Sequence, residues 1–133
     1  MRSSNATAAS GAACRLTALL RHLAILVRDI RTARRFYETY FGFDAGKPEW
    51  FGEVLFVRND EGFDLAFMRG DHPPNPGAFH HFGFQLSDRR AVRDLQKRLE
   101  ADNVPILEVV DDADQLSFKC ADPDGYTVEV YAS

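Results

Sequence analysis

The segments HLAILVRD at residues 22–29 and HFGFQLSD at residues 81–88 follow one pattern, and this repetition decides the fold. Each begins with His, alternates apolar residues and ends in Asp. Apolar alternation is the period of a half-buried β-strand. Asp directly after such a strand favours the start of a helix, because its carboxylate caps free backbone N–H groups. The chain therefore contains an internal repeat, which sets its whole architecture.

The sequence after each segment repeats as well. Apolar residues at helical spacing predict helices from Asp29 to about Phe41, with Gly42 as the stop, and from Asp88 to about Asn103. The turn signals NDEG at 59–62 and DPDG at 122–125 each lie between two strand-like runs. Further strands are predicted near 44–48 and 106–110. Each half thus reads as strand, helix and three strands.

Length and composition predict one compact domain. The chain has 133 residues, 45% of them hydrophobic, with 11 Phe, which is enough to bury a core. Sixteen Lys and Arg against 20 Asp and Glu, for a net charge of −4, argue against nucleic acid as the main partner. No apolar run approaches the ~18 residues of a membrane span, and two Cys cannot build a disulfide framework. We expect a cytoplasmic protein without a membrane partner.

The repeat also predicts the domain organisation. Residues 1–17 are rich in small residues and lack the apolar segment of a signal peptide, so a disordered tail is expected there. A single domain then spans 18–133. It consists of a first module over about 18–69, a linker rich in Pro and Gly over 70–77, and a second module over about 78–133.

Helices must cover the apolar face of each sheet, so the other residues of each strand lie on the opposite face. This face collects several polar and aromatic side chains. Its positions in the first half include His22, Val54, Phe56, Asp64, Ala66 and Met68, and in the second His81, Gln85, Ser117, Lys119, Glu129 and Tyr131. Burying such polar groups costs several kcal/mol unless they are paired or bind a ligand. This face is therefore predicted to line a pocket.

Two imidazoles and a carboxylate on one concave surface can form a facial triad. His22, His81 and Glu129 are the candidate ligands, and Fe(II), Mn(II), Ni(II) and Zn(II) all suit this donor set. His72 lies in the linker and His80 has the helix-facing parity, so neither is expected to bind metal.

At these residues the chain resembles the vicinal oxygen chelate superfamily, also called the glyoxalase/bleomycin-resistance/dioxygenase family. The resemblance covers about residues 19–132. Its motifs here are HLAILVRD at 22–29, RFY at 35–37 with FGF at 41–43, HFGF at 81–84 and DPDGYTVE at 122–129. It implies an α+β fold in which two βαβββ modules form an open eight-stranded mixed barrel, commonly in a homodimer. It also places His22, His81 and Glu129 on the family's metal-ligand positions.

Departures from the family pattern narrow the expected activity. Ala66 stands where glyoxalase I enzymes place a fourth ligand, and Asp64 is one pleat away. Ser117 and Phe118 match fosfomycin-resistance enzymes, but Lys119 replaces an aromatic residue and Ala24 a Thr. Drug-sequestering members of the family lack the metal triad, so its presence here counts against simple drug sequestration.

We therefore expect a metal-dependent enzyme of this superfamily, with one divalent metal ion per chain and Glu129 in the catalytic centre. Its small substrate would chelate the metal through oxygen and be anionic. Substrate contacts are assigned to the residues that share the pocket face, namely Phe56, Gln85, Ser117, Lys119 and Tyr131. The alternative is a non-catalytic binding or resistance protein for a small molecule or a bleomycin-like antibiotic. For Lys119 two roles stay open, a solvated lysine at the barrel edge or an ammonium beside the substrate.

Overall fold

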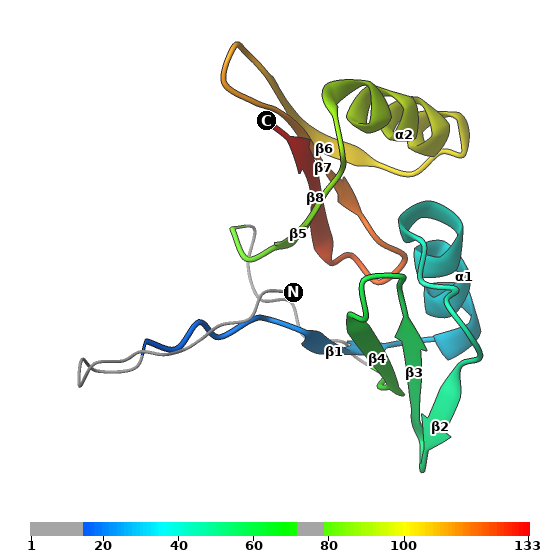
Figure 1. The fold of residues 1–133 in the computed structure, drawn as a ribbon. Helices are drawn as coiled ribbons and strands as arrows, with labels where there is room; N and C mark the ends of the chain where they lie inside the picture. The colour runs from blue at the N-terminus through cyan, green and yellow to red at the C-terminus, as the bar shows by residue number, and fades with distance from the viewer. Residues whose placement is uncertain (1–14, 72–78) are drawn as a thin grey trace.

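The computed structural model describes residues 15–71 and 79–133 and contains the predicted repeat (Figure 1). The first module comprises β1 (His22–Val27), α1 (Ile30–Phe41), β2 (Glu49–Phe51), β3 (Val54–Arg58) and β4 (Asp64–Arg69). The second comprises β5 (Phe82–Gln85), α2 (Arg89–Ala101), β6 (Ile106–Asp111), β7 (Leu116–Ala121) and β8 (Thr127–Ala132). Most of the predicted tail, most of the predicted linker and His72 lie outside the described residues. Neither α1 nor α2, the helices of the described part, is long and apolar enough to cross a membrane.

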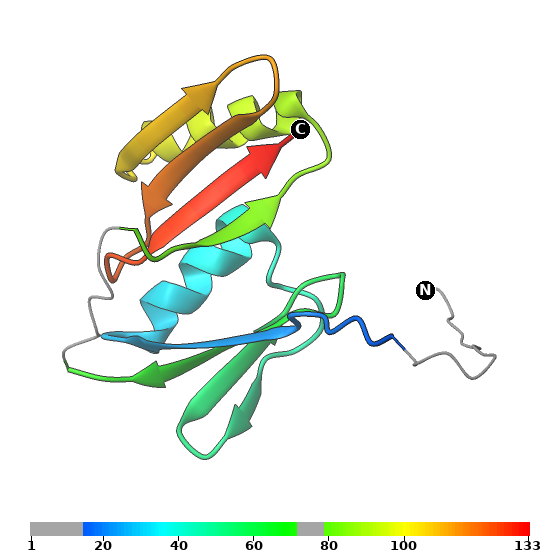
Figure 2. The same cartoon turned by 90° about the vertical axis from the view of Figure 1, so that its left-hand side faces the viewer.

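The two sheets have the same topology, which confirms that the modules are structural copies. Their strand orders are β1-β4-β3-β2 and β5-β8-β7-β6. The first strand of each module runs parallel to the last, and the other pairs are antiparallel. The sheets form a curved arrangement that does not close into a complete barrel (Figure 2).

Both helices begin and end as predicted. Oδ1 of Asp29 accepts a hydrogen bond of 3.2 Å from the Arg31 backbone N–H, and Oδ1 of Asp88 accepts one of 2.8 Å from that of Ala91. Gly42, at φ 74°, adopts the left-handed conformation that ends α1. Asn103, at φ 62°, follows the end of α2.

The strand predicted near 44–48 is wrong: these residues form a loop, and β2 begins at Glu49. Gly46 has a φ of 74°, which breaks the extended conformation. Pro48 has no N–H to donate to a strand ladder. The short strand Glu49–Phe51 then pairs with β3 across a tight turn at Gly52, where φ is 59°.

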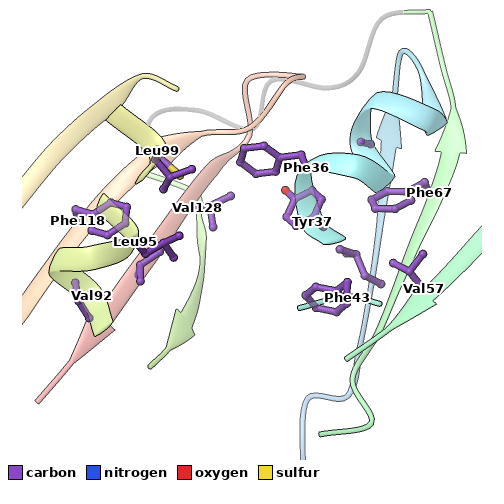
Figure 3. Close-up of a cluster of buried hydrophobic side chains, with 14 of the residues drawn as sticks. Phe36, Tyr37, Phe43, Val57, Phe67, Val92, Leu95, Leu99, Phe118 and Val128 are labelled. Atoms are coloured by element: carbon purple, nitrogen blue, oxygen red, sulfur yellow. The ribbon is translucent and has the colours of Figure 1, made fainter. Parts of the chain in front are cut away.

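The core places α1 between the two sheets (Figure 3). The ring of Tyr37 lies 5.8 Å from that of Phe67 in the first sheet, and the ring of Phe41 lies 4.7 Å from that of Phe84 in the second. The apolar face of α2, formed by Val92, Leu95 and Leu99, is buried in the same core cluster. Both helices thus cover the faces predicted from the alternation, and one face of each sheet has no helix on it.

The predicted turn at Asp122 also connects the two modules. Oδ2 of Asp122 accepts a 2.7 Å hydrogen bond from the Tyr37 hydroxyl, while Oδ1 accepts backbone N–H groups of Asp124 at 2.9 Å and Tyr126 at 2.8 Å. The Tyr126 hydroxyl in turn donates to the Leu26 carbonyl at 2.8 Å. The turn between β7 and β8 is therefore fastened to α1 and to the end of β1.

Candidate functional site

The candidate residues lie on the helix-free face of each sheet, here called the first and second open faces. On the first, His22 is the register partner of Asp64 and Phe56 that of Ala66. On the second, the partners are Lys119 with Glu129, Ser117 with Tyr131 and Gln85 with Tyr131. Because register partners point to the same side of a sheet, the five substrate-contact candidates and the metal-ligand candidates on strands lie on these open faces.

His81 and Glu129 meet at the second open face. Nε2 of His81 lies 3.0 Å from Oε1 of Glu129, and Nδ1 lies 2.6 Å from the carbonyl oxygen of Phe79. A carbonyl only accepts, so Nδ1 carries a proton and donates a hydrogen bond to the Phe79 carbonyl. In a neutral ring Nε2 then presents a lone pair to the carboxylate. Two electron-pair donors at this distance need a cation between them, either a shared proton or a metal ion.

This pair has the chemistry of two neighbouring metal ligands. Imidazole nitrogen and carboxylate oxygen bind divalent metal ions at roughly 2.0–2.2 Å, so two of them at the right angle of an octahedral site stand about 3.0 Å apart. The carbonyl on Nδ1 is the kind of partner that orients metal-binding histidines. Both side chains are about one-fifth exposed, which leaves the pair accessible from the open face.

His22, the third predicted ligand, lies elsewhere in the same chain. Its ring stacks on Phe56 with centroids 5.8 Å apart, and Phe56 in turn meets Phe51 at 5.4 Å. Across residues 15–71 and 79–133, no three His, Cys, Asp or Glu side chains come close enough to hold a metal ion together. One chain thus brings together two of the three predicted ligands.

The two open faces differ in character. The first has exposed apolar side chains, with Phe51 65% and Met68 46% exposed, and also the ion pair of Arg58 and Asp64 at 2.8 Å. The second carries the polar candidates, including the His81–Glu129 pair and Lys119. The first open face therefore combines an apolar area around Phe51 with charged groups, whereas the candidates on the second open face are mostly polar.

Lys119 projects onto the second open face, beside Glu129, as its parity predicted. Its Nζ lies 3.0 Å from Oε1 of Glu108, a residue of the edge strand β6 that the sequence analysis missed. The strand register shifts between Ile106 and Glu108, and this irregularity puts Glu108 opposite Lys119. An acidic, a basic and an acidic residue thus stand side by side across β6, β7 and β8.

The next row on the second open face contains the other polar candidates. Ser117 is buried, and its hydroxyl lies 3.3 Å from Nε2 of Gln115. A Cβ added at Gly83 would stand 3.3 Å from Cε1 of Tyr131, so the glycine makes room for the tyrosine ring. Gln85 is exposed and pairs with Tyr131.

A cavity of about 430 Å³ lies between β1 and β5 and is lined by residues of both strands. Its apolar lining includes Leu23, Phe63 and Phe84, and its polar lining includes His81 and Gln85. His81 is one of its lining residues, so a small molecule has access to this imidazole within a single chain.

The sequence matches that of a known family over residues 19–130, the Glyoxalase/Bleomycin resistance protein/Dioxygenase superfamily. The chain belongs to this superfamily. An uncharacterized protein of Pseudomonas aeruginosa, PA2024, is 32% identical over 119 residues, covering 83% of this chain and 85% of that relative.

Solved structures share the fold. A possible glyoxalase from Bacillus cereus superposes with a TM-score of 0.72 at 28% identity, covering 86% of this chain and 98% of its own. A mutant of the fosfomycin resistance protein FosX from Listeria monocytogenes, complexed with Mn(II) and a dihydroxypropylphosphonic acid, superposes with a TM-score of 0.72 at 19% identity. This second match covers 89% of this chain and 94% of FosX, and at such identity it shows the fold.

Proposed function

We propose that the protein is a metal-dependent enzyme acting on a small, anionic substrate that chelates the metal through two neighbouring oxygens. His81 and Glu129 supply two ligands, and His22 supplies the third. The observation that carries this proposal is the His81–Glu129 pair, in which Nε2 and Oε1 stand 3.0 Å apart while Nδ1 is held by the Phe79 carbonyl. These two atoms have the chemistry and the separation of adjacent ligands.

In this proposal a second copy of the chain provides His22, so the working unit is a homodimer. Two observations support it: His22 is not part of any three-residue donor group within the described ranges, and the first open face carries the exposed apolar side chains of Phe51 and Met68. If the first open face of one copy covers the second open face of the other, these apolar side chains lose contact with water. His22 would then complete the site.

The side chains around the pair have distinct proposed roles. A bound divalent metal would polarise the chelated substrate oxygens as a Lewis acid. Lys119 would neutralise the anionic group, Ser117 and Gln85 would offer hydrogen bonds, and Phe56 and Tyr131 would pack on the carbon skeleton. The Mn(II) and phosphonic acid bound by FosX support a divalent metal and an anionic ligand for this fold.

The first test is metal analysis of the purified protein. We expect about one divalent ion per chain, and less than a tenth of that after His81→Ala, Glu129→Ala or His22→Ala. The His80→Ala variant is the matched control and should keep its metal. A wild-type protein that holds no metal, yet gains thermal stability from a bleomycin-like drug, would instead indicate the non-catalytic binding protein.

The second test concerns the shared site. A heterodimer of one His22→Ala chain and one Glu129→Ala chain contains one intact set of ligands only if each set spans two chains. Purified through two different affinity tags, this heterodimer should hold one metal ion per dimer. A heterodimer without metal would show that all three ligands come from the same chain.

A further inference from the structure

The ion pair between Lys119 and Glu108 joins two residues with different access to solvent. The Lys119 side chain is 22% exposed, whereas that of Glu108 is 52% exposed and belongs to the edge strand β6. The lysine is therefore held on the second open face, while the glutamate has room to turn into water. Lys119 is also the register partner of Glu129, so its side chain shares the open face of the proposed metal pair, one strand away from Glu129.

We propose that Glu108 is a specificity-determining residue, which occupies Lys119 in the ligand-free protein and gives way to the anionic group of the ligand. This inference rests on the proposed function, because it concerns the substrate class of that same site. An incoming anion must displace a carboxylate already in place 3.0 Å from the ammonium. Anions with no more charge than a carboxylate gain little by this exchange, whereas doubly charged phosphonates or phosphates gain more.

The charge balance of the second open face supports this selection. Glu108 and Glu129 flank Lys119 on both sides, so the row as a whole is negative when His81 is neutral. A ligand that does not also engage a cation at the His81–Glu129 pair meets two carboxylates for one ammonium. Glu108 thereby favours ligands that carry both an anionic group and metal-chelating oxygens.

The experiment is a double-mutant cycle with methylphosphonate as the probe. Its dissociation constant is measured by ³¹P NMR titration at pH 8 on wild-type protein, Glu108→Gln, Lys119→Met and the double variant, all with measured metal content. Exposed ion pairs contribute up to about fivefold to an equilibrium constant, and removing a like charge adds to this. We therefore expect Glu108→Gln to tighten binding about three- to tenfold when Lys119 is present and less than about twofold in the Lys119→Met background.

A matched control removes the same charge elsewhere. Glu100 lies on α2, outside the open faces. The Glu100→Gln variant should therefore bind methylphosphonate with unchanged affinity. The inference is overturned if Glu108→Gln weakens binding or leaves it unchanged, because Glu108 would then orient Lys119 or take no part. An equal gain in the Lys119→Met background, or no binding by any of the four proteins, overturns it as well. Absence of metal from all four proteins would contradict the proposed function. The dissociation constants of the four proteins would still test the role of Glu108.

Discussion

The hydroxyl of Tyr37 donates a 2.7 Å hydrogen bond to Oδ2 of Asp122, and both side chains are buried. Tyr37 belongs to α1 of the first module, whereas Asp122 begins the turn between β7 and β8 of the second. This contact spans 85 positions of sequence. It therefore helps to fix how the modules sit against each other, and with them the separate positions of His22 and the His81–Glu129 pair.

Tyr37→Phe should lower the free energy of unfolding by about 1 to 3 kcal/mol, because the buried Asp122 carboxyl loses a hydrogen-bond donor. Tyr40→Phe is the matched control. Its hydroxyl also donates to a carboxylate, Asp102, at 2.6 Å, but in a solvent-accessible place where water can substitute. We expect less than about 1 kcal/mol there. Urea unfolding followed by circular dichroism measures both, and equal losses would contradict the structural role of the Tyr37 contact.

Asp122 should make stability fall as the pH rises. Burial raises the pKa of this carboxyl above its ordinary value of 3.8, despite the hydrogen bonds from Tyr37, Tyr126 and Asp124 that lower it. Because the folded state then binds the proton more tightly than the unfolded state, the contribution is full below the unfolded pKa. It is lost as the pH rises through the folded pKa.

The measurement is the difference in unfolding free energy between wild type and Asp122→Asn from pH 3.5 to 7. The asparagine should become relatively more stable as the pH rises, since it removes the buried charge. Asp29 and Asp111 contribute in the opposite direction, because hydrogen bonds lower their pKa values. The main donor is Thr32 for Asp29 and Arg93 for Asp111. Both proteins share these contributions, so the difference between wild type and variant cancels them. A difference that runs the other way would show that the hydrogen bonds outweigh burial.

Cys120 should be unreactive in the folded protein. Burial raises the pKa of its thiol to about 12, and the thiolate is the reactive form. In a Cys14→Ser variant, Ellman's reagent at pH 8 should label no thiol before unfolding and one thiol per chain in 8 M urea. Complete labelling of the native variant within minutes would contradict the burial of Cys120.

Phe51→Glu should separate a dimer built on the open faces and lower its metal content. Trp50 is the matched control, because it is the next residue along β2, is 59% exposed and points to the other side of the sheet. We expect Trp50→Glu to keep both the dimer and the metal. Sedimentation velocity measures the oligomeric state of the two variants, and metal analysis measures their metal content. A monomeric wild-type protein, or a Phe51→Glu variant that still dimerises, would contradict assembly through the first open face.

The sequence by itself determined the local structure and the face on which each candidate lies. The repeat predicted two copies of one module, and the caps at Asp29 and Asp88 and the stop at Gly42 fixed the helices. Such features depend on neighbouring residues, whose interactions are visible within a few positions. The alternation of β7 and β8 likewise put Lys119 beside Glu129, because a regular strand sends every second side chain to the same side.

The tertiary structure alone decided which of these side chains meet. Strict alternation from Ile106 would turn Glu108 toward the helices, but the shifted register in β6 places it opposite Lys119. The equivalent positions of His22 and His81 in the repeat do not bring them to one metal-binding group within a chain, because α1 packs between the sheets through Tyr37, Phe41 and Phe67. That packing is the sum of many contacts between distant residues, so no local pattern encodes it.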